Sequence, residues 1–265
     1  MFDTRVNLTR LEKEVLEYEK AEIEPGKILF WGDSGFTRWR ERFGNRPLES
    51  VILGKDGSKA IVNHGIGGAT AEELLFYYPR MLQAWKPRAL VLKAYANDDY
   101  FGYSPREILS LQAKILDYAR VHMPGIRFYL CDISVRTRYT DNDIAWHTWE
   151  SRAYEYNRLL QEYCGKHEDC TYVCHSQSPL FFADPADVGD YRKVRRDILS
   201  KIRCILIRQD MICIRNSSVK CWMIFCDAVI AAVTVEVVGT VIGGDSCACV
   251  DGWKSVLGVY SIFSV

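Results

Sequence analysis

The sequence has no excess of either charge, because 34 lysine and arginine residues balance 34 aspartate and glutamate residues. Without a long block of one sign, there is no reason to expect nucleic acid or an anionic membrane as a partner. The most apolar stretch, 221–244, is interrupted by Asp227 and Glu236, so it lacks the run of about 20 apolar residues that a membrane span needs. The N-terminus lacks the basic and apolar regions of a secretory signal. We therefore expect a cytoplasmic protein with a small-molecule or protein partner.

The sequence also lacks any Cys-x-x-Cys pair, although it contains ten cysteines. Without an export signal, we expect these cysteines to be free thiols. Zinc binding is the alternative for Cys164, Cys170 and Cys174, which lie near His167 and His175. Their spacings match none of the usual zinc patterns, so we expect no metal site.

Residues 27–199 alternate short apolar, β-rich stretches with longer amphipathic ones. This alternation is typical of a parallel sheet covered by helices, so the predicted fold class is three-layer α/β with about five strands. Thr70 with Glu73, and Ser104 with Pro105, mark two helix starts. We predict strands at 27–31, 59–63, 88–95, 126–132 and 170–175, and helices at 1–20, 70–85, 105–122 and 145–164.

Three unusual loops follow the first three predicted strands, where such sheets bind ligands. They read Gly32-Asp33-Ser34, NHGIGGAT (63–70) and YAND (95–98). Each loop alone has a structural explanation: a turn or helix cap for the first, and an Asx turn for the third. The second nearly matches a dinucleotide-binding fingerprint, but Thr70 stands where that motif needs glycine. A nucleotide-binding α/β domain is therefore the weaker interpretation.

Together, and in this order, the three loops resemble the SGNH (GDSL-type) hydrolases, a family of esterases and acylhydrolases with a flavodoxin-like αβα fold. The resemblance covers about residues 25–199. It implies that Ser34 is the nucleophile, and that the Ser34 N–H, the Gly68 N–H and the Asn97 side chain form the oxyanion hole. It also implies hydrolysis of carboxylic esters through an acyl-serine intermediate, with no metal or organic cofactor.

Two features depart from the family pattern. Tyr95 stands where the family commonly has glycine before the Asn-Asp pair, and this bulky residue is expected to narrow the pocket or alter substrate choice. The family also supplies its base and orienting acid from an Asp-x-x-His block near the C-terminus, whereas no histidine follows His175 here. His175 is the first substitute base. We expect His64 to pack or cap in its turn, His122 to be solvated, and His147 and His167 to lack a carboxylate partner.

The composition changes after about residue 199, since six of the ten cysteines lie beyond residue 200. A reading-frame change explains this tail better than a membrane span does. One permitted codon choice for residues 199–218, read one nucleotide back, encodes FEDKVHFNQTGYDLYQEFF, which contains Asp-x-x-His. The predicted organisation is therefore an N-terminal helical extension (1–24), an SGNH hydrolase-like domain (25–199) and an atypical, frameshifted tail (200–265).

These observations leave two functions open. The first is a serine ester hydrolase for a small-molecule ester, with an acetylated sugar and a short-chain acyl ester equally open as substrates. The second is a noncatalytic protein that binds an acylated sugar or lipid in the same pocket. Retention of Ser34, Gly68 and Asn97 favours the enzyme, and the missing histidine favours the binding protein. The sequence does not decide the oligomeric state.

Overall fold

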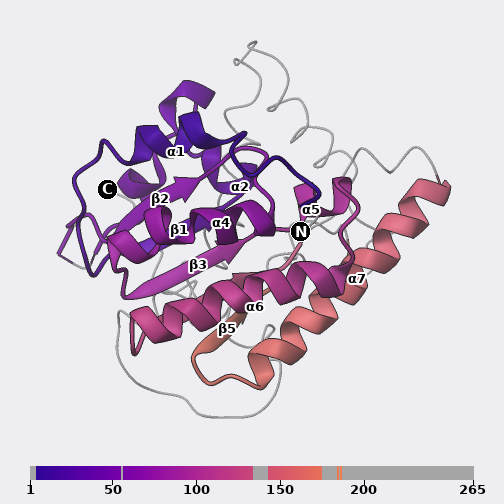
Figure 1. The fold of residues 1–265 in the computed structure, drawn as a ribbon. Coiled ribbons are helices and arrows are strands. Elements are labelled where there is room, and N and C mark those ends of the chain that lie inside the picture. The colour runs from indigo at the N-terminus through magenta and orange to yellow at the C-terminus, as the bar shows by residue number, and fades with distance from the viewer. Residues whose placement is uncertain (1–3, 55, 134–142, 175–183, 185, 187–265) are drawn as a thin grey trace.

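Five parallel strands form the centre of the molecule in a computed structural model that describes residues 4–54, 56–133 and 143–174, together with Asp184 and Ala186 (Figure 1). The strand order is β2-β1-β3-β4-β5. This is the order of flavodoxin-like sheets, so the predicted three-layer α/β fold is confirmed. The strands are β1 (Ile28–Gly32), β2 (Ile61–Gly65), β3 (Ala89–Lys93), β4 (Arg127–Cys131) and β5 (Cys170–Val173).

Helices cover both faces of this sheet. A larger apolar core joins the sheet to α1, α4, α6 and α7, and a smaller one joins it to α2 and α3. Their bounds are α1 (Glu12–Tyr18), α2 (Ser34–Thr37), α3 (Leu48–Val51), α4 (Ala71–Met81), α5 (Ala96–Tyr100), α6 (Pro105–His122) and α7 (Asp143–Gly165), with 3-10 turns at η1 (Glu41–Phe43) and η2 (Gln83–Trp85).

Successive side chains of each central strand enter opposite cores. In β1, Leu29 and Trp31 belong to the larger core, whereas Ile28 and Phe30 belong to the smaller one. All four are at most 1% exposed. A strand that is buried on both faces needs apolar residues at consecutive positions, which explains the continuous apolar sequence of β1.

Local capping signals place the helix starts where the sequence predicts them. Thr70 accepts a hydrogen bond from the Glu73 N–H, and the Glu73 side chain accepts one from the Thr70 N–H, which completes a capping box. Ser104 and Glu107 form the same arrangement at the start of α6. Helix α6 therefore spans the predicted residues 105–122.

The N-terminal helix is shorter than predicted. The sequence predicts a helix over 1–20, but α1 spans only Glu12–Tyr18. The Asn7 side chain accepts hydrogen bonds from the Thr9 N–H and hydroxyl, at 3.0 and 2.9 Å, and such local bonds compete with a helical backbone. Leu11 and Val15 belong to the larger core, so this segment packs against the α/β unit.

The tail prediction lies outside the described residues, and the three domain boundaries stay predictions. In the described part of the chain, no helix combines the length and apolar character that a bilayer span requires.

Candidate active site

The loops after β1, β2 and β3 meet at one edge of the sheet. These strands are adjacent and parallel, and their ends are in register: Gly32 pairs with Gly65 on one side and with Lys93 on the other. The Asp33 N–H donates to the Lys93 carbonyl oxygen at 3.1 Å, and the Ile66 N–H donates to the Gly32 carbonyl oxygen at 2.8 Å. The sequence predicts that Ser34, Gly68 and Asn97 lie in these three loops, and the structure places all three at this edge.

Ser34 is the first residue of α2, directly after β1. The Asp33 side chain caps this helix by accepting a hydrogen bond from the Gly35 N–H at 2.8 Å, and Asp33 is only 3% exposed. Ser34 itself is partly exposed. Its hydroxyl has no hydrogen-bond partner among the described residues. The helix start thus presents the Ser34 hydroxyl without a local acceptor for its proton.

Two glycines shape the loop after β2. A Cβ atom on Gly65 would lie 2.2 Å from the Thr37 nitrogen, so only glycine allows α2 to approach β2 this closely. Gly68 has a φ of +83°, in the left-handed region that favours glycine. The chain turns at Gly68 and enters α4 through its N-cap, Thr70.

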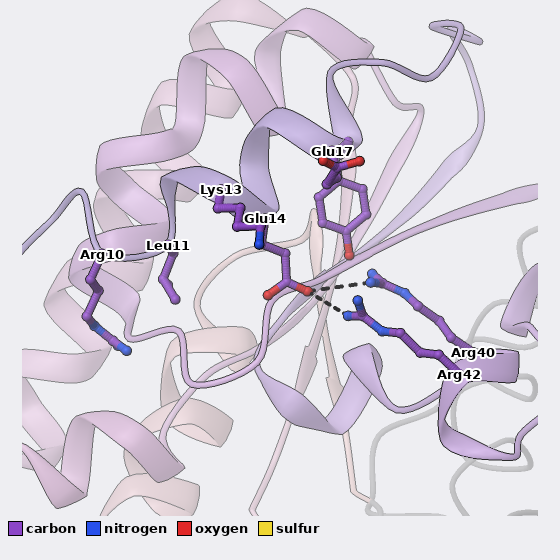
Figure 2. A pocket seen from close by; sticks show the side chains of 8 residues that line it. Arg10, Leu11, Lys13, Glu14, Glu17, Arg40 and Arg42 are labelled. Carbon is purple, nitrogen blue, oxygen red and sulfur yellow. Dashed lines mark hydrogen bonds and ion pairs between the residues drawn. The ribbon is translucent and has the colours of Figure 1, made fainter.

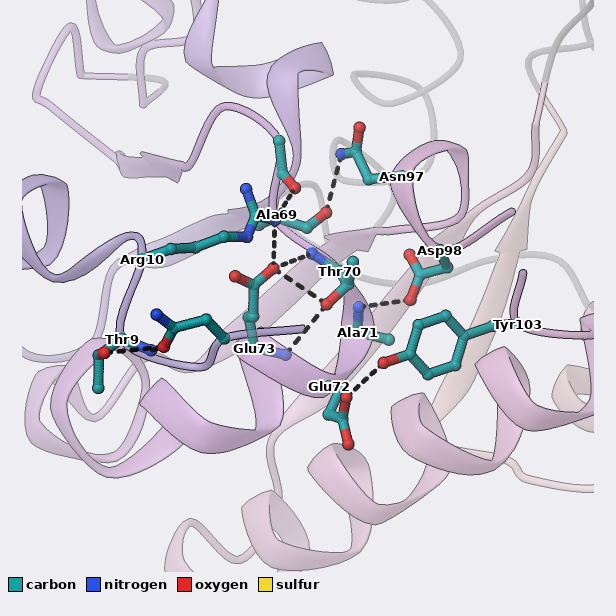
Figure 3. A network of polar contacts seen from close by, with 12 residues as sticks. Thr9, Arg10, Ala69, Thr70, Ala71, Glu72, Glu73, Asn97, Asp98 and Tyr103 are labelled. Atoms are coloured by element: carbon teal, nitrogen blue, oxygen red, sulfur yellow. Dashed lines mark hydrogen bonds and ion pairs between the residues drawn. The ribbon is translucent and has the colours of Figure 1, made fainter. Parts of the chain in front are cut away.

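Asn97 connects the third loop to the second. It lies in α5, a single helical turn, rather than in the Asx turn that was the structural alternative for this loop. Its side-chain nitrogen donates to the Ala69 carbonyl oxygen at 2.9 Å, as Figure 3 shows. One of the two N–H bonds of this amide is therefore engaged, and the other remains for a ligand.

Some backbone N–H groups at this edge have no acceptor within the described residues, and two of them matter for the site. They belong to Ser34 and Gly68, two positions that the family resemblance assigns to an oxyanion hole. Most buried or partly buried backbone donors in proteins are paired with protein or water. Both groups are therefore able to donate to a bound molecule.

Asp98 is a buried acid beside these donors. Its side chain accepts a hydrogen bond from the Ala71 N–H at 2.7 Å, so it ties α5 to the start of α4 (Figure 3). The second carboxyl oxygen has no hydrogen-bond partner among the described residues. Burial raises the pKa of Asp98 to about 7, and the charges of Asp33 and Glu73 add to this rise, while the Ala71 N–H opposes it.

None of the three histidine side chains that the structure describes contacts Ser34. His64 is 1% exposed, its Nδ1 lies 3.0 Å from the Met81 carbonyl oxygen, and burial lowers its pKa to about 4. His122 is exposed at the end of α6, and its Nδ1 lies 3.0 Å from the Tyr78 hydroxyl. His167 stacks on Tyr163.

Packing of His64 is thus confirmed. His122 is exposed to solvent, as predicted, but its ring also contacts the Tyr78 hydroxyl. The His147 side chain and His175 lie outside the description.

Tyr95, the departure from the family pattern, is 2% exposed and belongs to the larger core. Its ring centroid lies 4.7 Å from that of Tyr156 in α7. This packing gives Tyr95 a structural role. Its effect on the pocket stays a prediction.

Cys131, Cys164 and Cys170 form no disulfide bond, as expected. Cys164 and Cys170, two of the zinc candidates, are buried, and burial raises the pKa of the Cys164 thiol to about 12. No cluster of three or more metal-binding side chains occurs among the described residues. Cys164 packs in the larger core as a small apolar side chain, whereas the Cys170 thiol also accepts a hydrogen bond from Arg120 and donates one to Asp169, both at 3.4 Å.

A groove of about 510 Å³ lies between α1 and the turn after α2 (Figure 2). Arg40 and Arg42 converge on Glu14 across it, at 3.5 and 3.0 Å. Ser34, Gly68 and Asn97 do not line this groove. Three of its basic side chains, those of Arg10, Arg40 and Arg42, are already engaged in ion pairs, and the pairs of Arg40 and Arg42 with Glu14 hold α1 against the domain.

Sequence reasoning missed the polar contacts behind the Gly68 turn. Arg10, 58 residues before Gly68, donates to the Gly68 carbonyl oxygen at 2.6 Å and to the buried Glu73 at 2.7 Å (Figure 3). The capping-box signal identified Glu73 as a helix-start residue. No local pattern pointed to Arg10 or to the role of Asp98 at α4.

No protein-family model matches the sequence, and neither does any curated protein. Solved structures do match. A candidate acylhydrolase from Bacteroides fragilis gives a TM-score of 0.55 at 14% identity, over 89% of this chain and 100% of its own. A GDSL-like lipase from Bacteroides thetaiotaomicron gives 0.55 at 14% identity, over 86% of this chain and 98% of its own.

A variant of an acetyl-xylooligosaccharide esterase from Geobacillus gives 0.52 at 16% identity, over 85% of this chain and 100% of its own. At these identities the matches establish a shared fold.

Proposed function

We propose that this chain, which has the fold of the SGNH hydrolases, is a carboxylic ester hydrolase that acts through an acyl intermediate on Ser34. One observation carries the proposal. The Ser34 hydroxyl and the Ser34 and Gly68 N–H groups share one edge of the sheet and have no partners among the described residues. A nucleophile on the same edge as backbone N–H groups that can bind an oxyanion is what acyl transfer needs.

In the proposed mechanism, a base takes the proton of the Ser34 hydroxyl as its oxygen attacks the ester carbonyl carbon. The carbonyl oxygen becomes an oxyanion and accepts hydrogen bonds from the Ser34 N–H, the Gly68 N–H and the free N–H of Asn97. The intermediate collapses, the alcohol leaves with the proton from the base, and the acyl group stays on Ser34. Water then attacks the acyl-serine by the same route and releases the acid.

The base is the missing part of this mechanism. We propose that the natural reading frame supplies it through the Asp-x-x-His of FEDKVHFNQTGYDLYQEFF, in place of the sequence from residue 199 on. Without a base, only binding and the oxyanion hole would act. Serine hydrolases without their triad retain about 10³- to 10⁴-fold catalysis over water.

The proposed substrate is a small ester, either an acetylated sugar or a short-chain acyl ester. The name of the Geobacillus neighbour, an acetyl-xylooligosaccharide esterase, supports the first class. Lipase and acylhydrolase neighbours support the broader class of acyl esters. The proposed site requires no metal or organic cofactor.

Hydrolysis of p-nitrophenyl acetate tests the proposal in the full chain and in a tail-replaced variant, in which FEDKVHFNQTGYDLYQEFF substitutes for the sequence from residue 199 on. We expect Ser34-dependent hydrolysis only in the tail-replaced variant. Ser34→Ala should abolish it, whereas Ser50→Ala, which removes an exposed hydroxyl bonded to the Pro47 carbonyl oxygen, should not. Full activity of the original chain through Ser34 would show that another base acts and that the account of the tail is wrong.

The second candidate is a noncatalytic protein that binds an acylated sugar or lipid at the same site. The absence of any contact between Ser34 and the histidine side chains described above favours it. If neither form hydrolyses the ester, but acetylated xylooligosaccharide raises the melting temperature of the full chain, the binding protein is the better description.

A further inference from the structure

We infer that Arg10, in the segment before α1, is a positioning residue that holds the Gly68 turn in its working geometry. This inference rests on the proposed function, because it assigns Arg10 a task in the proposed oxyanion hole. Arg10 would not touch the substrate. It would act through the backbone that carries the Gly68 N–H.

The contacts of Arg10 are directed at the turn itself. Its Nη2 donates to the Gly68 carbonyl oxygen at 2.6 Å and to Glu73 Oε2 at 2.7 Å. Its Nη1 lies 3.4 Å from the position that a Cβ on Gly68 would occupy. The guanidinium thus connects Gly68 with Glu73 in the first turn of α4. Figure 3 shows the side chains of Arg10 and Glu73.

Glu73 makes this contact more than a surface ion pair. Its side chain is fully buried, whereas the Arg10 side chain is 32% exposed. Glu73 Oε2 also accepts hydrogen bonds from the Thr70 N–H and hydroxyl, both at 3.0 Å, and its Oε1 has no partner among the described residues. A buried carboxylate needs a compensating positive charge, and Arg10 supplies it. Removal of Arg10 would therefore disturb both the helix cap and the turn.

Two successive carbonyl groups of the turn are then fixed from opposite sides. Arg10 holds the Gly68 oxygen, and the Asn97 side chain holds the Ala69 oxygen at 2.9 Å. These bonds hold the Gly68–Ala69 and Ala69–Thr70 peptide planes. The Gly68 N–H belongs to the preceding Gly67–Gly68 plane, so the bonds constrain its direction through the φ angle of Gly68, which is +83°. Oxyanion donors act only if they are placed in advance to within a fraction of an ångström.

The same N-terminal segment also holds the loop that follows Asn97. Arg10 lies over the Phe101 ring, 5.4 Å from its centroid. Arg5 donates to the Gly102 carbonyl oxygen at 2.7 Å and pairs with Glu107. The segment therefore bridges the second and third loops of the site, and Leu11 and Val15 anchor it in the core.

The test compares Arg10→Met, which keeps the length of the side chain but not its charge, with Arg10→Lys. Arg158→Met is the matched control, because Arg158 forms an exposed ion pair with Glu162 within α7. In the full chain, hydrogen–deuterium exchange is measured for 66–74 and, as an internal reference, for α6. We expect Arg10→Met to speed exchange in 66–74 by about tenfold, with α6 unchanged.

The kinetic readout uses whichever form hydrolyses p-nitrophenyl acetate through Ser34. Arg10→Met should lower kcat by about 10- to 100-fold with little change in KM, because misplaced donors affect the transition state most. Arg10→Lys should recover part of this loss, and Arg158→Met should lose nothing. A merely structural role would instead lower the melting temperature and speed exchange throughout the chain.

Unchanged exchange in 66–74, or faster exchange with unchanged kcat, would overturn the inference. Faster exchange confined to 66–74, with no Ser34-dependent hydrolysis in any form, would overturn the proposed function and show that Arg10 only holds the turn. The two failures are therefore distinguishable.

Discussion

The Ser34 turn and the Gly68 turn both start helices at the ends of adjacent strands, but they are held differently. The Ser34 turn has a local side-chain cap, since Asp33 accepts a hydrogen bond from the N–H of Gly35, two residues away, and one long-range backbone bond, from the Asp33 N–H to the Lys93 carbonyl oxygen at 3.1 Å. The Gly68 turn is held by distant segments, through Arg10 on one side and Asn97 on the other. The oxyanion side of the proposed site is thus built from the described residues, whereas the nucleophile still needs a base.

The substitution with the largest expected effect on this comparison is Asn97→Ala. This change removes a proposed oxyanion donor and the bond to the Ala69 oxygen, so kcat for Ser34-dependent hydrolysis should fall by about 10²- to 10³-fold. The matched control is Asn45→Ala, which also removes a side-chain bond to a backbone carbonyl, that of Arg38, at 2.7 Å. Steady-state kinetics with p-nitrophenyl acetate measure both. Equal effects of the two substitutions would remove Asn97 from the mechanism.

The second prediction concerns the carboxylates that bind the two helix starts. Asp33 caps its own helix, whereas Asp98 bonds the start of α4 from another element, and burial raises the pKa of Asp98 from 3.8 to about 7. At a pH between these two pKa values, Asp98 therefore keeps its proton in the folded state and loses it in the unfolded state. The contribution of Asp98 to the free energy of unfolding is fully present below about pH 4 and is lost as the pH rises through about 7.

Asp98→Asn mimics the protonated acid and keeps an oxygen for the Ala71 N–H. Relative to the original chain, the variant should gain stability between pH 4 and pH 8 by up to about 4 kcal/mol, since each pKa unit corresponds to about 1.4 kcal/mol. Urea unfolding at the two pH values measures this gain. Asp117→Asn, at an exposed acid paired with Arg120, is the control and should show little pH-dependent difference. A flat profile for Asp98→Asn would mean that Asp98 is charged throughout this range.

The sequence predicted most of the fold because the signals involved are local. The capping box at Ser104 and the sequence Pro124-Gly125 define α6 at both ends. The end of β2 was predicted less well: the strand was expected to end at residue 63 but continues to Gly65. His64 looks like a loop residue in sequence, yet Tyr18 and Trp85 enclose it in the folded chain. That environment exists only after distant segments pack.

The same distinction applies to the candidate site. Ser34, Gly68 and Asn97 could be nominated because each lies directly after a predicted strand in a recognisable loop. Arg10 could not, because its contacts with Gly68 and Glu73 span 58 and 63 residues. Arg10 lies in a charged N-terminal segment, and no local feature of the sequence distinguishes it from an arginine that is exposed to solvent.

The smallest predicted effect comes from a comparison of two glycines. It separates the effect of the left-handed backbone conformation of Gly68 from the effect of its place in the proposed site. Gly68 and Gly125 have nearly the same left-handed conformation, with φ values of +83° and +86°. Alanine at either site should cost about 1 to 2 kcal/mol of unfolding free energy, since an L residue pays that much in this region. Gly125 lies in the turn after α6, with no atom within 4 Å of an added Cβ, whereas the Cβ at Gly68 would lie 3.4 Å from Arg10.

We therefore expect Gly68→Ala and Gly125→Ala to match within about 1 kcal/mol in urea unfolding and to differ in activity. Only Gly68→Ala should lower kcat, by about tenfold, because only there does the altered backbone carry a proposed oxyanion donor. Equal kinetic effects would mean that the strain acts through global stability. A much larger stability loss at Gly68 would show instead that the long-range side-chain contacts of this turn cannot adjust to one methyl group, which would strengthen the contrast with the Ser34 turn and its local side-chain cap.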